Sequence, residues 1–332
     1  MVVVMAILVT GGTGLVGSQL IEDLIEYGHP PSVIRALVRP PSDTILLQRK
    51  GVQLCYGDVL DLKSLTAAVR DVHTVFHCAG AVTEKRKQLF WQINFYGTER
   101  MLEAARLSGV KKFIHVSTIG IYGLLQKTPA TEDHPKNPLR PYAVAKLAAE
   151  EKVWEYYRTH GLKSVALRPT AIVGERDRTI TKRLVALARR KVVPVIDRGK
   201  AGVSFVDVRD LTRAMILASE CENAVGKAYN VQGFSAPIRD VVQFFIRAVG
   251  SRARIIDVPY ALAYAGAFLI DGFYAMVRST HHPIRARKGV QQLTRDLTFD
   301  TTRIRTDLHF EPRYGMDESF RRAIQWQLEH GN

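Results

Sequence analysis

The sequence predicts an α/β fold in which a doubly wound, mostly parallel sheet carries a smaller C-terminal lobe. Short apolar runs rich in β-branched residues alternate with helical stretches through the first half of the chain. Short connections between such elements imply right-handed crossovers and parallel strands. A glycine-rich turn after the first run also predicts this fold. The expected strands are 3–9, 33–38, 52–56, 72–78, 112–117 and 164–168, and the expected helices are 15–27, 62–69, 89–108 and 142–159.

The alternation loosens after about residue 170, which indicates a second structural unit. We expect residues 1–170 to form a nucleotide-binding domain whose sheet is completed by about 203–232. Residues 171–202 and 233–332 would then form the substrate-binding lobe. The helices predicted in this half are 179–191, 208–219, 238–249 and 316–330, and the strands are 202–206 and 227–231.

The composition is that of an ordinary globular protein, with 46% hydrophobic and 24% charged residues in a chain of 332. These values exclude the disordered, collagen-like and coiled-coil classes. Cys55, Cys78 and Cys221 cannot form a disulfide framework and lack metal-ligand spacing. We therefore expect no metal site and a reducing, cytoplasmic location. The apolar N-terminus runs directly into a glycine turn, which favours a buried strand over a signal peptide.

Basic residues outnumber acidic ones by 47 to 32, so the formal net charge is +15. Such an excess can indicate nucleic acid, an anionic membrane, a phosphorylated ligand or only a soluble surface. No recognised module supports nucleic acid, so we expect no nucleic-acid partner. We interpret one basic cluster as the solvated face of a helix rather than as a site for a nucleotide-sugar diphosphate or coenzyme A. Its members are Arg176, Arg178, Lys182, Arg183, Arg189, Arg190 and Lys191.

Residues 10–17, Thr-Gly-Gly-Thr-Gly-Leu-Val-Gly, stand between the first strand and the first helix. A turn this sharp needs glycine at positions of positive φ, and a pyrophosphate approaches closely only where side chains are absent. The helix N-terminus adds N–H donors and the positive end of its dipole. In this position the motif predicts nucleotide binding rather than a plain glycine-rich turn. The expected contacts are Gly11, Thr13, Gly14, Leu15, Val16 and Gly17.

Arg39 stands at the end of the second strand, where an acid would bind the 2′-hydroxyl of a ribose. The forked donors of an arginine suit a 2′-phosphate instead, which favours NADP over NAD. The alternative is a surface arginine, and the nearby Asp43 keeps NAD open.

The ends of the third and fourth strands supply further candidates. Asp58, before Val59, either accepts a bond from an adenine amino group or caps the helix that begins near Asp61. Ala79 and Gly80 are small enough to let the backbone lie against the cofactor. We expect His77 and Cys78 to be packed core residues rather than catalysts.

Tyr142 and Lys146 lie four residues apart at the start of a strongly helical segment, so they share one face. A phenol exchanges protons poorly at neutral pH, and a neighbouring ammonium would lower its pKa and make it a usable general acid or base. Thr118 follows the fifth strand and could donate to a substrate oxygen, or cap a turn. Together with the nucleotide turn, these residues are the candidate catalytic set.

The chain resembles the extended short-chain dehydrogenase/reductases along essentially its whole length, with the motifs in the same order and spacing. These motifs lie at 10–17, 58–59, 94–98, 102–105, 116–118, 121–123, 142–146, 168–174, 205–210 and 229–231. The resemblance implies a Rossmann-type fold in which Tyr142 is the acid/base, Lys146 binds the nicotinamide ribose and Thr118 is the catalytic hydroxyl. The other cofactor contacts it implies are Asn94, Ser117 and Pro169. It also implies a homodimer built from helices 89–108 and 142–159.

Positions at which this sequence differs from particular branches of the family limit the reactions that it can be expected to catalyse. The sugar 4,6-dehydratases carry an Asp-Glu pair directly after the active-site Thr, whereas Ile119 and Gly120 follow Thr118 here, which argues against dehydration. The sequence looks more like the dihydroflavonol reductases and 3β-hydroxysteroid dehydrogenases. We expect NADP-dependent hydride transfer with a carbonyl or secondary alcohol of a hydrophobic substrate, such as a sterol-like, flavonoid-like or alkyl ketone. The alternatives are a nucleotide-sugar 4-epimerase with tightly bound NAD and a non-catalytic, cofactor-binding scaffold.

Residues 258–277 form the most apolar stretch of the chain, and Pro259 and Asp271 interrupt it. A membrane-spanning helix with a central aspartate is costly, so we do not expect one. The stretch is either a buried helix of the lobe, which we slightly favour, or part of a peripheral membrane contact through 258–288. The cations that would meet anionic headgroups are Arg278, His281, His282, Arg285, Arg287 and Lys288.

Overall fold

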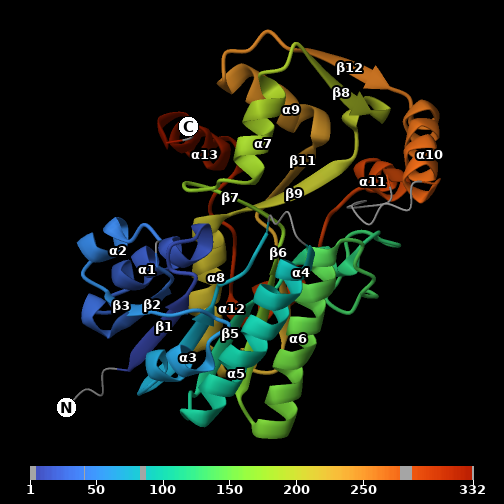
Figure 1. Ribbon diagram of the computed structural model, residues 1–332. Coiled ribbons are helices and arrows are strands. Elements are labelled where there is room, and N and C mark those ends of the chain that lie inside the picture. Colours follow the sequence, from blue (N-terminus) through green and yellow to red (C-terminus); the bar gives the residue numbers. More distant parts are fainter. Residues whose placement is uncertain (1–4, 41, 83–86, 277–285, 331–332) are drawn as a thin grey trace.

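The computed structural model describes residues 5–40, 42–82, 87–276 and 286–330. Within these ranges, seven parallel strands form the central sheet in the order β10-β6-β5-β4-β1-β2-β3 (Figure 1). The chain runs outward from β1 to β3 and then returns to β4, so the carboxyl ends of β1 and β4 frame the crevice where such sheets bind ligands. The strands are β1 (Ala6–Thr10), β2 (Ile34–Val38), β3 (Gln53–Tyr56), β4 (Val72–His77), β5 (Lys112–Val116), β6 (Lys163–Pro169) and β10 (Ala228–Val231).

Helices cover both faces of the central sheet and bury a separate core on each face. On one face α1 and α8 pack on the strands with α12, and on the other α3, α5 and α6 do so (Figure 1). The predicted doubly wound, Rossmann-type fold is confirmed. The elements around the sheet are α1 (Leu15–Glu26), α2 (Ile45–Arg49), α3 (Leu62–Ala68), α4 (Lys87–Phe90), α5 (Gly97–Leu107), α6 (Pro141–His160), α8 (Val208–Glu220) and α12 (Thr302–Leu308).

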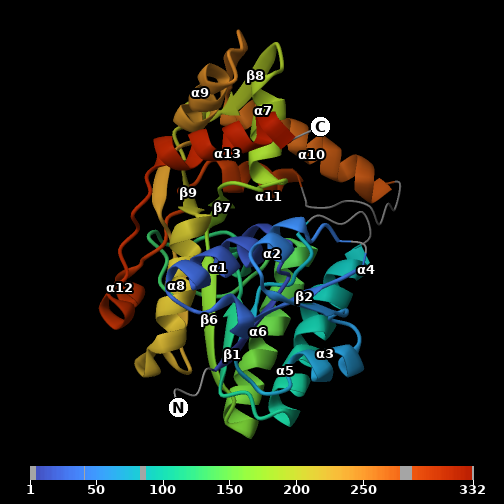
Figure 2. The same cartoon turned by 90° about the vertical axis from the view of Figure 1, so that its left-hand side faces the viewer.

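A smaller lobe lies above the carboxyl ends of the central strands (Figures 1 and 2). Its core is aromatic: the rings of four phenylalanines lie 5.0–5.5 Å from the ring of Phe320. Two small sheets support it, β11-β9-β7 and β12-β8. The elements are β7 (Ala171–Val173), β8 (Val192–Ile196), β9 (Gly202–Asp207), β11 (Phe234–Pro237), β12 (Arg254–Val258), α7 (Ile180–Ala188), α9 (Ile238–Ala248), α10 (Tyr260–Met276), α11 (Ala286–Leu293) and α13 (Met316–His330).

Two predicted elements differ from the structure. The stretch 203–232 was expected to complete the central sheet, but only β10 joins it, because β9 pairs with β7 and β11 in the lobe. The predicted helix 89–108 is interrupted, since residues Trp91–Tyr96 are π-helical between α4 and α5. The position of β9 is decided by its pairing with strands distant in the chain, which local propensity does not specify.

The interpretation of the apolar stretch 258–277 as a buried helix is wrong. The stretch does form α10, but in this helix only Ala267 and Asp271 are buried among the side chains that the structure describes. Residues 277–285, and with them four of the predicted headgroup-binding cations, lie outside the described part. In the described ranges no helix is both long and apolar enough to cross a bilayer.

Candidate functional site

The glycine turn between β1 and α1 leaves no room for side chains. Gly11 has a φ of +68°, and a Cβ there would meet the backbone of Ala79 at 2.9 Å. A Cβ on Gly17 would lie 2.3 Å from the Gly11 carbonyl oxygen. Gly14 is the N-cap of α1 and has no side chain to block the helix N-terminus, while Thr13 is exposed beside it. This cradle, which any Cβ would fill, fits a dinucleotide pyrophosphate.

Arg39 and Asp58 line one pocket of about 570 Å³ beside this turn. Arg39 is exposed and directly follows β2, and no acid is paired with it in the described part of the chain. Asp61, not Asp58, caps α3 by accepting from the backbone N–H groups of Lys63 and Ser64. The Asp58 carboxylate instead accepts from Leu60 N–H at 2.8 Å, which holds it at the mouth of the pocket.

The segment after β4 is held in place by buried polar side chains. Asn94 accepts from Ala81 N–H at 2.8 Å and donates to Ala81 C=O at 3.0 Å, so both ends of its amide are occupied. His77 bonds to Thr10 and Thr98, and its burial together with the Lys146 charge lowers its pKa to about 3. His77 is therefore neutral and structural, as expected. Asn94 shapes the backbone at Ala79 and Gly80 by holding its neighbour Ala81.

The structure brings Thr118 and Tyr142 together at the carboxyl end of β5. The Thr118 hydroxyl lies close enough to the Tyr142 phenol to lower its pKa, and the Phe90 ring packs edge-on against Tyr142 at 6.1 Å. Enclosure of the phenol raises the pKa of Tyr142 to about 12, and the effect of Thr118 offsets only part of that rise. The expected lowering of the Tyr142 pKa by the Lys146 charge is not found.

Lys146 is buried, and its Nζ donates to Val116 C=O at 2.5 Å and to His115 Nε2 at 3.4 Å. Burial lowers the pKa of Lys146 to about 8, against the opposing effect of the Glu150 charge. Burial, followed by the Lys146 charge, lowers the pKa of His115 well below its usual range, so the imidazole is neutral and accepts this bond. One Lys146 N–H stays available for a ligand hydroxyl.

Beneath these groups lies a buried ion pair that the sequence analysis missed. Arg168 donates to both carboxylate oxygens of Glu150, at 2.5 and 3.1 Å, and also to the Tyr122 hydroxyl at 2.7 Å. Burial would raise the pKa of Glu150, but Arg168 holds it below its usual value. The Ser117 hydroxyl donates to Glu150 at 2.5 Å, so its proton is not available to a ligand. The signal was available, because Glu150 continues the four-residue spacing of Tyr142 and Lys146.

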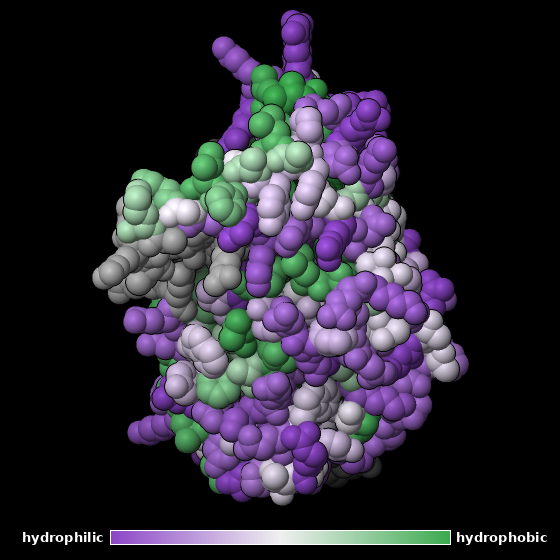
Figure 3. Space-filling model, turned by 90° about the vertical axis from the view of Figure 1, so that its right-hand side faces the viewer, coloured by the Kyte–Doolittle hydropathy of each residue, from purple (hydrophilic) through white to green (hydrophobic). Residues whose placement is uncertain are grey.

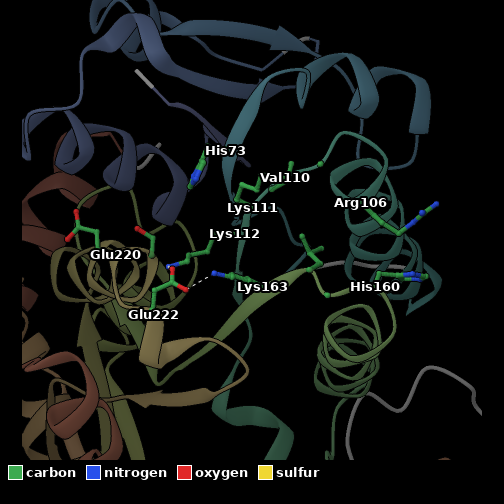
Figure 4. A pocket seen from close by; sticks show the side chains of 13 residues that line it. His73, Arg106, Val110, Lys111, Lys112, His160, Lys163, Glu220 and Glu222 are labelled. Atoms are coloured by element: carbon green, nitrogen blue, oxygen red, sulfur yellow. Dashed lines mark hydrogen bonds and ion pairs between the residues drawn. The ribbon is translucent and has the colours of Figure 1, made fainter. Parts of the chain in front are cut away.

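A second pocket, of about 610 Å³, lies at the opposite end of the sheet, where β5 and β6 begin (Figure 4). It is rich in cations, and Glu222 bridges two of them, Lys112 at 3.0 Å and Lys163 at 2.7 Å. α5 and α6 both end there, and the carboxyl end of a helix carries partial negative charge. Arg106 is also paired, with Glu103 at 2.7 Å, and this pocket does not include any residue of the candidate site.

Among the comparisons with known proteins, a model described as NAD dependent epimerase/dehydratase family matches residues 7–231, from β1 to the end of β10. The chain belongs to this family. The resemblance to the extended short-chain dehydrogenase/reductases is thereby confirmed, and the protein is an NAD(P)-dependent enzyme of that type.

Members of the family with assigned reactions match this chain along most of its length. Sterol-4-alpha-carboxylate 3-dehydrogenase, decarboxylating, from Mus musculus is 28% identical over 335 residues, covering 96% of this chain and 89% of the mouse protein. 2-Alkyl-3-oxoalkanoate reductase from Stenotrophomonas maltophilia is 28% identical over 333 residues, covering 96% and 98%. The crystal structure of gox2253 superposes with a TM-score of 0.86 at 25% identity and covers 98% of both chains.

Replacing Lys146 by Met should change how stability depends on pH. The folded-state pKa of Lys146 is lowered to about 8 from 10.5, so between these values the unfolded state binds more protons. The cost of burying the charge is therefore complete below pH 8 and disappears as the pH rises toward 10.5. Between pH 8 and pH 10.5 the unfolding free energy of the wild type should therefore rise by about 3 kcal/mol relative to that of Lys146→Met.

Urea unfolding of both proteins at the two ends of the window measures this gain. Lys63→Met, at an exposed position of α3, is the control and should follow the wild type throughout. If the difference between wild type and Lys146→Met stays constant with pH, Lys146 is not held as a desolvated cation.

Proposed function

We propose that this protein is an NADP-dependent oxidoreductase acting on a carbonyl or secondary alcohol of a hydrophobic substrate. The observation that carries the proposal is that the hydroxyls of Thr118 and Tyr142 lie together at the carboxyl end of β5, with the buried Lys146 one helical turn from Tyr142 along α6. Bound nicotinamide supplies or accepts the hydride. The residues proposed to hold the cofactor are Gly11, Thr13, Gly14, Leu15, Val16, Gly17, Arg39, Asp58, Val59, Ala79, Gly80, Tyr142, Lys146 and Pro169, with Asn94 and Ser117 shaping the site from behind.

In this proposal each polar group has a separate task. Thr118 donates to the substrate oxygen and so holds the reacting carbon in place. Tyr142 keeps its proton at neutral pH, because its pKa is raised to about 12, and it delivers that proton to the oxygen during reduction. Lys146 uses its remaining N–H on a ribose hydroxyl and keeps a positive charge close to the reaction.

NADP is supported by the exposed Arg39 at the pocket beside the glycine turn. Arg39→Gln should weaken NADPH binding by about tenfold to hundredfold, the value of one lost charge-assisted contact, and leave NADH binding unchanged. Isothermal titration of both cofactors measures this. Arg49→Gln, at an exposed position of α2, is the matched control. Equal losses for NADPH and NADH would show that Arg39 does not read the 2′-phosphate.

The hydrophobic substrate is supported by the activities of two relatives, the sterol-4-alpha-carboxylate 3-dehydrogenase and the 2-alkyl-3-oxoalkanoate reductase. The same proposal includes a homodimer through α5 and α6, as in the resembling family, and a cytoplasmic protein that meets a membrane peripherally through 258–288. The exposed apolar side chains of α10 support that contact.

Native mass spectrometry of the purified protein, before and after dialysis, tests the proposed function. We expect cofactor to be lost on dialysis and to be restored by NADPH in preference to NADH, because a reductase exchanges its cofactor every cycle. Retained NAD would instead indicate a nucleotide-sugar 4-epimerase, in which the cofactor is recycled without leaving. If NADPH binds but is not oxidised in the presence of any sterol, flavonoid or alkyl ketone, the protein would be the non-catalytic, cofactor-binding scaffold.

A further inference from the structure

The most exposed apolar side chains of the lobe form one stripe along α10. Leu262, Leu269, Phe273 and Met276 are 66%, 71%, 58% and 75% exposed. They follow each other at intervals of seven, four and three residues, which places them on a single side of the helix. Figure 3 shows hydrophobic side chains gathered on the upper part of this face, where α10 lies.

The only charged residue of α10 points away from this stripe. Asp271 is buried and accepts from the backbone N–H of Ala286 at 2.5 Å and from Arg287 Nε at 2.9 Å. It therefore fastens α11 against the inner side of α10. The outward side of α10 carries no ionised group, so the aspartate that argues against a membrane-spanning helix does not oppose a peripheral contact through this side.

The apolar surface continues onto the neighbouring small sheet and ends in cations. β12 leads into α10 and pairs with β8, and the exposed Val192 and Ile256 lie on these two strands. Both strands begin at a basic cluster that is exposed to solvent. Its members are Arg189, Arg190, Lys191, Arg252 and Arg254. The one acid of β12, Asp257, is paired with Arg239 at 2.6 Å.

We propose that α10, with the outer face of the β8–β12 sheet, docks this protein on a lipid bilayer that contains anionic headgroups. Apolar side chains from one side of a helix enter the acyl boundary, while nearby cations meet the headgroup phosphates. The exposed cations at the start of β8 and β12 and the formal net charge of +15 favour an anionic bilayer over a second, equally cationic copy of the chain. The stripe has no polar group with which to recognise a particular protein. This inference rests on the proposed function, because a hydrophobic substrate dissolves in the bilayer and would enter the protein from there.

Co-sedimentation of the full chain with vesicles tests the docking. We expect the wild type to bind vesicles of phosphatidylcholine mixed with phosphatidylglycerol, and to bind phosphatidylcholine alone more weakly. The variant Leu262→Gln/Leu269→Gln should lose about tenfold or more of this binding, because two side chains no longer enter the acyl region. Ile45→Gln/Leu328→Gln changes side chains of similar exposure, 56% and 51%, on other surfaces and is the matched control.

Three results would overturn the proposal. The first is equal vesicle binding by the stripe variant and the wild type. The second is no preference for anionic vesicles, or a preference that survives Arg189→Gln/Arg190→Gln. The third is a vesicle-free dimer that the stripe variant converts to monomer, which would make α10 an interface between copies. NADPH binding in solution, which none of these variants should change, reports folding and tests the proposed function separately.

Discussion

Tyr142→Phe should lower turnover by about 10²–10⁴-fold, the usual contribution of a positioned proton donor, and leave NADPH affinity largely intact, because the other cofactor contacts remain. The substitution removes only the hydroxyl that lies next to Thr118, and the ring can keep its edge-on contact with Phe90. Steady-state oxidation of NADPH with the ketone that the wild type reduces fastest measures turnover, and isothermal titration measures affinity.

The matched control for this variant lies on the same helix. Tyr156 is also on α6, but its hydroxyl bonds to Glu103 at 3.2 Å, far from the candidate site. Tyr156→Phe should therefore keep full turnover. If Tyr142→Phe turns over like Tyr156→Phe, the proposed mechanism is wrong, because another group must then supply the proton.

Glu150→Ala should lower the free energy of unfolding by about 3–5 kcal/mol, the cost of leaving a buried charge without its partner. Arg168 is 2% exposed and Glu150 is fully buried, so water cannot replace the lost carboxylate. Ser117 and Trp154 also lose the acceptor to which they donate. Glu150→Gln, which keeps the shape and one acceptor oxygen, should cost less. Urea unfolding at neutral pH gives all of these values.

An exposed ion pair on the neighbouring helix is the control for this result. Glu103 and Arg106 of α5 are 2.7 Å apart at the surface. Glu103→Ala should cost less than about 1 kcal/mol, because solvent screens exposed pairs. A cost for Glu150→Ala no larger than this would mean that the buried pair does not stabilise the layer beneath Thr118 and Tyr142.

Local rules were sufficient for most elements of the central domain. α6 begins with Pro141 in its first turn and ends at Gly161, whose φ is +67°, and both positions are readable in the sequence. The predicted helix 316–330 matches α13 at both ends. Short β-branched runs predicted the central strands in the same way. In contrast, the partners of β9 depended on contacts with β7 and β11, elements that the sequence analysis did not predict.

In the candidate site, too, some features were predictable from the sequence and others depend on contacts between distant segments. Spacing alone placed Tyr142 and Lys146 on one face of a helix. The glycine pattern at residues 10–17 likewise predicted a sharp turn with room for a pyrophosphate. The raised pKa of Tyr142 was not predictable, because it depends on how completely other elements enclose the phenol. The partners of Asn94 and Ser117 were equally hidden, since Ala81 and Glu150 approach them only in the folded chain.

Local patterns in the chain predicted the family, the strands and helices of the central domain in chain order, the cradle for a dinucleotide and the residues around which the chemistry is proposed. Each of these depends on neighbours in the chain or on fixed helical and strand periods. The tertiary structure alone decided that Glu150 and Arg168 form a buried pair and that Asp271 turns inward while the apolar side of α10 stays exposed. Burial and charge pairing are set by segments distant in sequence, and the free energy of a charge depends on those surroundings.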